Sequence, residues 1–306
     1  MAGALSNLAG LLAGLIVLPW IWARYLRRDV DNFRNKAPGA LIRLSRGVTH
    51  ARWHGPEGGP VLVCVHGLAT PSYVWGPLIP YLTEQGYSVL VYDLYGRGYS
   101  DRVRGRQTRE FFLSQLRDLL AAEGVEGRLS LMGYSMGGSI AAAYAAENPD
   151  RIDRLILLAP AGLILQRDRW ARFVIGTPII GDWLNEVIGP ARFRRQNATP
   201  PEDPDAREIQ GRVLREIRWR GSMAAMLSSL RNILSEDLRA DHAAIAEAGI
   251  PVLAIWGGKD PVIPLRAMAR LAEVNRKALH VELPDADHGL PYTYPASVSE
   301  AVEEVY

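Results

Sequence analysis

The sequence predicts an α/β fold with a mostly parallel central sheet, helices on both faces and an inserted helical cap. Short apolar runs alternate with stretches of helical spacing along residues 60–159, and the same alternation resumes along residues 251–305. A gap rich in arginine and tryptophan, residues 163–240, separates the two parts. Alternating strands and helices are typical of a parallel sheet covered by helices, and the gap is then expected to form a cap.

The individual elements follow from periodicity and from turn residues. Residues 29–39 are expected to be a linker, and residues 41–53 alternate enough for two short strands. Continuous apolar runs predict strands that are buried on both faces. They lie at 60–65, 87–92, 129–133, 152–159, 251–256 and 279–283, and helices are expected at 108–123, 136–147, 265–274 and 296–305. The predicted body is therefore 40–162 and 241–306, with 163–240 as the cap.

Composition narrows the classes of protein. The chain has 306 residues, of which 48% are hydrophobic and 22% charged, as in folded globular proteins. A net charge of +2 gives no reason to expect a nucleic-acid partner. Cys64 is the single cysteine, so the chain forms no internal disulfide, and no spacing of cysteines and histidines resembles a metal site. We expect neither a metal nor another cofactor.

The N-terminal segment differs from the rest of the chain. Residues 1–23 carry no charged side chain, residues 8–23 are mostly apolar, and Arg24, Arg27 and Arg28 follow. Basic residues after an apolar stretch, with Trp20 and Trp22 beside them, favour an uncleaved membrane anchor over residues 1–28. The body would then lie on the cytoplasmic side of the inner or plasma membrane. The alternative is a soluble cytoplasmic protein whose first helix packs on the cap or meets a partner.

Residues 133–137 read G-x-S-x-G between a predicted strand and a predicted helix. The turn at such a motif is sharp, and Gly133 and Gly137 leave room for it. The hydroxyl of Ser135 then projects at the carboxyl edge of the sheet as a candidate nucleophile. The alternative interpretation is a tight turn with an incidental serine.

A serine hydroxyl needs a base, and the base needs a carboxylate that orients it. His288 lies in the loop after the last predicted strand, and Asp260 lies in the loop after the strand before it. We therefore expect His288 as the base and Asp260 as its partner. Asp285 and Asp287 are alternative carboxylates, although their place beside His288 favours loop capping.

Stabilising an oxyanion requires two donors. The amide of Met136 begins the helix after the nucleophile, and a second amide is expected after the strand at 60–65. There Gly67 lets the backbone bend so that the amide of Leu68 points into the site. His66 is expected to brace this loop.

Together these motifs resemble the α/β-hydrolase superfamily over about residues 40–306. The resemblance rests on His66-Gly67, Asp93-x-x-Gly96-Arg97-Gly98-x-Ser100, Gly133 to Gly138, Gly258-x-Asp260 and Asp287-His288-Gly289. It looks closest to the branch with monoacylglycerol lipases and small bacterial esterases. In that family Asp93 and Arg97 would support the loop beneath the site. A serine at 135 argues against haloalkane dehalogenases and epoxide hydrolases, whose nucleophile is aspartate.

The resemblance implies a serine hydrolase that cleaves carboxylic esters. Apolar stretches in the cap, together with the expected anchor, favour a lipophilic acyl ester such as a monoacylglycerol. The alternatives are a carbon–carbon bond hydrolase or a perhydrolase with the same three residues. A membrane-anchored binding module without turnover is a further alternative.

Overall fold

The computed structural model describes the backbone of residues 2–305 and the side chains of residues 7, 10, 14–25 and 27–305. Its centre is one eight-stranded sheet in the order β1-β2-β4-β3-β5-β6-β7-β8. The strands are β1 Ala40–Arg43, β2 Val48–His54, β3 Val61–Val65, β4 Ser88–Tyr92, β5 Leu129–Tyr134, β6 Ile152–Leu158, β7 Val252–Gly257 and β8 Leu279–Leu283.

Pairing within the sheet is parallel from β4 to β8, whereas β1 pairs with β2 and β2 with β4 in the antiparallel sense. The predicted mostly parallel α/β fold is therefore confirmed. Strands β3 to β8 match the expected ranges to within a residue at each end. Strands β3 to β7 are almost wholly buried, which explains their continuous apolar sequences.

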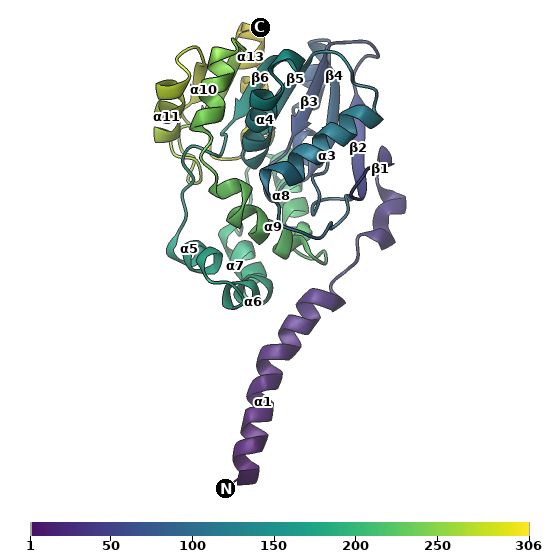
Figure 1. Ribbon diagram of the computed structural model, residues 1–306, viewed down its shortest axis with the longest axis vertical. Coiled ribbons are helices and arrows are strands. Elements are labelled where there is room, and N and C mark those ends of the chain that lie inside the picture. The colour runs from purple at the N-terminus through teal and green to yellow at the C-terminus, as the bar shows by residue number, and fades with distance from the viewer. Residues whose placement is uncertain (1, 306) are drawn as a thin grey trace.

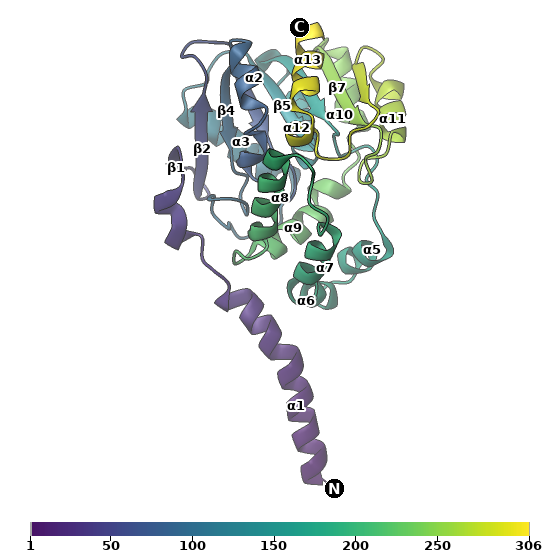
Figure 2. The same cartoon turned by 180° about the vertical axis from the view of Figure 1, so that it is seen from behind.

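Helices cover both faces of the sheet. On the face nearer the viewer in Figure 1 lie α3, α4, α10 and α11, and on the face seen in Figure 2 lie α2, α12 and α13. Their bounds are α2 Ile79–Glu84, α3 Arg109–Ala122, α4 Met136–Glu147, α10 Arg239–Glu247, α11 Arg266–Val274, α12 Leu290–Thr293 and α13 Pro295–Val305. Short helical turns lie at η2 Asp31–Lys36, η3 Ser72–Trp75, η4 Pro149–Arg151 and η5 Ile233–Ser235.

Five helices between β6 and α10 form a separate layer below the sheet (Figure 1). They are α5 Arg169–Gly176, α6 Ile180–Val187, α7 Gly189–Gln196, α8 Pro204–Glu216 and α9 Ser222–Arg231. We propose that residues 163–240 act as a cap on the body. This layer lies at the carboxyl end of the parallel strands, where α/β sheets bind their ligands.

The buried side chains form one large core around the sheet. Its largest members include Trp75, Trp256 and Tyr92. Cys64 of β3 lies within this core and is fully buried. Burial raises the pKa of the Cys64 thiol, because the low-dielectric surroundings disfavour the thiolate.

The N-terminal helix α1 (Ala2–Ile21) continues into one π-helical turn, η1 (Trp22–Leu26), and extends away from the body (Figures 1 and 2). Within the described residues, no helix has the length and apolar character needed to cross a membrane. The expectation of a membrane-spanning segment over residues 8–23 is therefore not supported. The side chains of residues 8, 9 and 11–13 of that segment lie outside the described residues.

The C-terminal part of the N-terminal segment is fixed to the cap. Arg27 forms a buried ion pair with Glu186 of α6, with 2.9 Å between Nη1 and Oε2. The indole of Trp183, also on α6, donates a hydrogen bond to the carbonyl of Ile16 (2.8 Å). These contacts attach η1 and the end of α1 to the cap rather than to the sheet.

Candidate active site

The turn between β5 and α4 has the strained geometry of a nucleophile elbow. Ser135 has φ 53° and ψ −115°, a conformation that residues with a Cβ rarely adopt. Glycine is required at positions 133 and 137 because neighbouring backbone atoms approach both positions closely. A Cβ on Gly133 would lie 2.5 Å from the Gly137 carbonyl oxygen, and a Cβ on Gly137 would overlap the Val65 carbonyl oxygen. The chain can therefore place the Ser135 hydroxyl at the sheet edge only with glycine at these two positions.

Ser135, His288 and Asp260 lie in one hydrogen-bonded line. The distance from Ser135 Oγ to His288 Nε2 is 3.0 Å, and that from His288 Nδ1 to Asp260 Oδ2 is 2.6 Å. The Asp260 side chain is fully buried, and that of His288 is 22% exposed. A neutral His288 with its proton on Nδ1 donates to Asp260 and leaves Nε2 free to accept the serine proton.

Loops after the last two strands position His288 and Asp260. Asp260 follows β7, and its Oδ1 accepts hydrogen bonds from the amides of Val262 (2.7 Å) and Ile263 (2.9 Å). His288 follows β8, and its carbonyl accepts a hydrogen bond from the hydroxyl of Tyr134 (2.8 Å). The alternative carboxylates serve the loop itself, since Asp287 accepts from the amide of Gly289 and Asp285 pairs with Lys259.

The amides of Leu68 and Met136 are available as donors. Neither donates a hydrogen bond to another described residue. The loop that carries Leu68 is braced from below, because Arg97 Nε donates to the Leu68 carbonyl (3.0 Å).

His66 holds the start of the same loop. Its Nε2 accepts a hydrogen bond from the amide of Leu94 (2.9 Å), so the ring proton is on Nδ1, which faces the Gly67 carbonyl at 2.8 Å. Burial lowers the pKa of His66 to about 4, so the ring is neutral at physiological pH. A neutral ring that is hydrogen-bonded at both nitrogens acts as a brace.

Asp93 is the centre of the neighbouring turn. It accepts hydrogen bonds from the amides of Ser72 (2.8 Å) and Tyr99 (2.9 Å), and its Oδ2 lies 2.8 Å from His50 Nδ1. Burial opposes ionisation, but the hydrogen bond and charge of His50 outweigh it and lower the pKa of Asp93 to about 2.

Two long-range contacts in this geometry involve Tyr134, for which the sequence predicts no role, and Arg97, which is expected to support the loop beneath the site. Tyr134 precedes Ser135, yet its hydroxyl reaches the loop that carries His288. The contact of Arg97 is with the carbonyl of Leu68, which agrees with its expected role in supporting the loop. Neither long-range contact has a local sequence signal. Among the described residues, no group of histidine, cysteine, aspartate and glutamate side chains is arranged to hold a metal ion.

The sheet order and the turn at Ser135 define an α/β-hydrolase. Residues 62–301 match the model of the alpha/beta hydrolase family, and the chain belongs to that family. The match runs from β3 into α13 and includes residues 163–240.

Curated relatives include enzymes that act on different bonds. An uncharacterised protein of Mycobacterium tuberculosis is 28% identical, over 90% of this chain and 84% of its own. The pimeloyl-[acyl-carrier protein] methyl ester esterase of Nitrosomonas europaea is 27% identical, over 78% of this chain and 92% of its own. The 2-hydroxymuconate semialdehyde hydrolase of Pseudomonas sp. is 28% identical, over 74% of this chain and 80% of its own.

Solved structures share the fold. The enol-lactonase of Burkholderia xenovorans superposes with a TM-score of 0.69 at 23% identity, over 87% of this chain and 99% of its own. An esterase of Exiguobacterium antarcticum superposes with a TM-score of 0.73 at 20% identity, over 87% of this chain and 98% of its own.

Proposed function

We propose that the protein is a serine hydrolase that cleaves carboxylic esters through an acyl-enzyme. The observation that carries this proposal is the line of hydrogen-bonding contacts from Ser135 Oγ to His288 Nε2 (3.0 Å) and from His288 Nδ1 to Asp260 Oδ2 (2.6 Å). The relation to the pimeloyl-[acyl-carrier protein] methyl ester esterase of Nitrosomonas europaea supports an ester as the substrate.

The proposed reaction starts when Ser135 Oγ attacks the ester carbonyl carbon and gives its proton to His288 Nε2. Asp260 keeps the imidazole in the required tautomer and stabilises its cation. The amides of Leu68 and Met136 hold the negative oxygen of the tetrahedral intermediate. His288 returns the proton to the departing alcohol, and a water molecule then repeats the cycle on the acyl-enzyme.

A fluorophosphonate probe, which reacts only with an activated serine, tests this assignment. We expect labelling of the wild-type chain and its loss in Ser135→Ala, together with a fall in p-nitrophenyl ester hydrolysis of about 10³-fold or more. Ser139→Ala is the matched control, because Ser139 is a buried serine of α4 whose hydroxyl has no hydrogen-bond partner among the described residues. Labelling that survives in a folded Ser135→Ala protein would refute the proposal.

A carbon–carbon bond hydrolase is the second candidate. It is favoured by the relative of Pseudomonas sp. that is a 2-hydroxymuconate semialdehyde hydrolase. Turnover of a vinylogous diketone, followed by its absorbance, separates the two candidates. Cleavage of the diketone without hydrolysis of simple esters would favour this second function.

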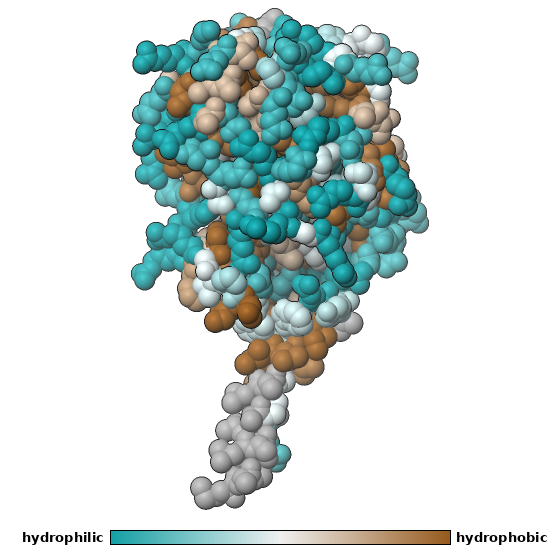
Figure 3. Space-filling view, in the orientation of Figure 1, coloured by the Kyte–Doolittle hydropathy of each residue, from teal (hydrophilic) through white to brown (hydrophobic). Residues whose placement is uncertain are grey.

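The proposed ester is lipophilic and is met at a lipid surface. Apolar side chains gather where α1 meets the lower end of the cap (Figure 3). Ile179 is 82% exposed and Ile180 57% exposed at the start of α6, and Leu15 of α1 is 70% exposed. Contiguous exposed apolar patches mark protein or membrane contacts, and this group supports such a contact. Trp22, Arg24, Tyr25 and Arg28 follow α1 in the chain and are also exposed, a combination of aromatic and basic side chains typical of a membrane interface.

Ile179 is held in an unfavourable backbone conformation. It has φ 68°, which is strained for a β-branched residue. Its amide donates to Asp182 Oδ2 (2.9 Å), and Arg231 of α9 pairs with the other oxygen of that carboxylate (2.7 Å). These contacts keep an apolar side chain turned outward, which supports contact with lipid tails. Faster hydrolysis of octanoyl than of acetyl p-nitrophenyl esters is the expected result, and a preference for acetate would count against a lipid substrate.

A further inference from the structure

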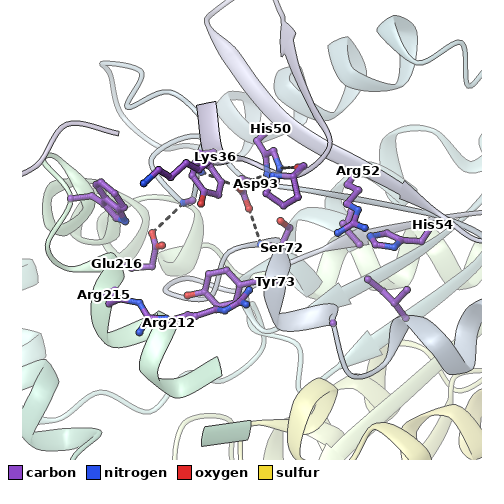
Figure 4. Close-up of a pocket in the computed structure, with 17 residues that line it drawn as sticks. Lys36, His50, Arg52, His54, Ser72, Tyr73, Asp93, Arg212, Arg215 and Glu216 are labelled. Carbon is purple, nitrogen blue, oxygen red and sulfur yellow. Dashed lines mark hydrogen bonds and ion pairs between the residues drawn. The ribbon is translucent and has the colours of Figure 1, made fainter. Parts of the chain in front are cut away.

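A cavity of about 480 Å³ lies between one edge of the sheet and the cap (Figure 4). Its walls come from β2, η3 and α8, and from residues of the N-terminal linker. None of Ser135, Asp260 and His288 lines it. The volume falls within the range of about 300–1,000 Å³ that small-molecule sites occupy.

Cations surround one end of this cavity. Arg212 and Arg215 project from the same face of α8 toward Tyr73, and Lys36 of the linker lies across from them (Figure 4). Arg212 lies over the Tyr73 ring, with 5.5 Å between Cζ and the ring centroid, and it forms an ion pair with Glu208. Within the described part of the chain, Lys36 and Arg215 form no ion pair. The cationic side chains at this end of the cavity can therefore bind an anionic ligand.

The two acids that line the cavity offset little of this charge. Asp93 is occupied by His50 and by two backbone amides. Glu216 is buried and accepts a hydrogen bond from the amide of Gly98 (3.2 Å). Burial raises the pKa of Glu216 to about 7, so this carboxyl is only partly ionised at neutral pH.

The Tyr73 hydroxyl gives a second and independent indication of a ligand. It is buried, yet it has no hydrogen-bond partner among the described residues. Figure 4 shows it on the side of the ring that faces Arg215 and Glu216. A buried hydroxyl without a partner costs free energy, and an oxygen atom of a bound ligand would satisfy it.

We propose that this cavity binds a small organic phosphate. The phosphate would lie at the end formed by Tyr73, Arg212 and Arg215, where two guanidinium groups and one hydroxyl donate to its oxygens. The organic part would extend along the apolar wall formed by Ile79 and Val91. A phosphate fits better than a carboxylate, because it carries more charge and has more acceptor oxygens for this set of donors. The source is either a free phosphorylated metabolite or the headgroup of a phospholipid.

Calorimetric titration of the full chain tests the site, with Ser135→Ala as the host protein so that no probe is hydrolysed. The probes are inorganic phosphate, glycerol 3-phosphate, glycerophosphocholine and, as the neutral control, glycerol. We expect saturable binding of glycerol 3-phosphate that weakens as salt is added, and no binding of glycerol. Preference for glycerol 3-phosphate indicates a free metabolite, whereas preference for glycerophosphocholine indicates a lipid headgroup.

Substitutions of the cavity residues test whether the phosphate binds at this site. Replacing Arg212→Gln and Arg215→Gln together should weaken binding at least about tenfold, and Tyr73→Phe should weaken it about fivefold. Arg276→Gln with Lys277→Gln is the matched control, since these two exposed cations lie next to β8 at the opposite edge of the sheet. Unchanged binding in Tyr73→Phe, equal affinity in the two double variants, or no saturation at about 10 mM of any phosphate would overturn the proposal. Because Ser135 is absent from the host, none of these results depends on the proposed hydrolase activity.

Discussion

The hydroxyl of Tyr134 donates a hydrogen bond to the main-chain carbonyl of His288, with 2.8 Å between the two oxygens. The same two residues also approach through their rings, whose centroids lie 5.3 Å apart. The residue before Ser135 therefore holds the loop that carries His288. Two elements far apart in sequence are joined directly beside the line formed by Ser135, His288 and Asp260.

Tyr134→Phe should act as a positioning variant. Loss of the hydroxyl frees the His288 loop, and we expect kcat for ester hydrolysis to fall about 3–10-fold with little change in KM. Tyr92→Phe is the control, because the buried Tyr92 hydroxyl has no hydrogen-bond partner among the described residues. Equal kcat values for the two variants would show that the contact does not position His288.

Replacing glycine by alanine should lower stability in the turn at Ser135 and raise it inside a cap helix. In Gly137→Ala the new Cβ would overlap the Val65 carbonyl oxygen, and we expect a loss of about 3 kcal/mol or more in the free energy of unfolding. In Gly211→Ala the new Cβ meets nothing closer than Arg215 Nη1 at 3.7 Å. Because Gly211 lies inside α8, this variant should gain about 0.5–1 kcal/mol. Urea unfolding checks both, and a stable Gly137→Ala protein would contradict the packing described.

Glu216 should make stability depend on pH. Burial raises the pKa of Glu216 from 4.5 to about 7. The guanidinium of Arg102 opposes this shift, with 3.9 Å between its Nη2 and Glu216 Oε2. The folded state then binds more protons than the unfolded state between these values, so stability is highest below 4.5 and falls as pH rises toward about 7. Glu216→Gln lacks this penalty and should gain up to about 3 kcal/mol relative to the wild type between about pH 5 and about pH 8.

Urea unfolding of both proteins across this range measures the difference. The groups that surround Glu216 are Arg102, Asp93, the Gly98 amide and Trp219. None of them changes in the variant, so the difference between the two curves isolates the one carboxyl. Parallel curves for wild type and Glu216→Gln would place the pKa of Glu216 near its ordinary value.

The exposed isoleucines of the cap should govern binding to lipid. Ile179→Asp with Ile180→Asp should lower partitioning of the full chain onto vesicles roughly tenfold, because two apolar groups are lost and two negative charges are added. The vesicles contain phosphatidylglycerol and phosphatidylcholine, and sedimentation measures the bound fraction. Leu279→Asp is the control, since Leu279 is also exposed but belongs to β8. Equal partitioning of both variants would show that the cap isoleucines do not contact the vesicles.

Much of the fold was predictable because local patterns determine it. Runs such as residues 61–65 are buried on both faces, and their continuous apolar sequence reflects that environment. The turn at Ser135 was predictable for a similar reason, since only glycine fits at Gly133 and Gly137. The loops that carry Asp260 and His288 follow recognisable strands, which placed both residues at the same edge of the sheet.

Other features depend on contacts between distant segments. Arg27 and Glu186 lie 159 residues apart, and nothing in either sequence neighbourhood predicts their buried ion pair. The apolar run and the arginines after it predict an anchor, whereas the structure ties the C-terminal end of this segment to the cap. The cavity beside Tyr73 likewise requires the linker, η3 and α8 to meet, which only the tertiary structure reveals.

Cys64, enclosed in β3, has a consequence for experiments in solution. As the single sulfhydryl of the chain, buried and with a raised pKa, it is protected from alkylating reagents while the protein is folded. A cysteine introduced on α6 or at the end of α1 would then be the one site that takes up a maleimide dye. The native sequence is therefore ready for fluorescence or spin-label measurements of how the cap moves, without removal of any existing residue.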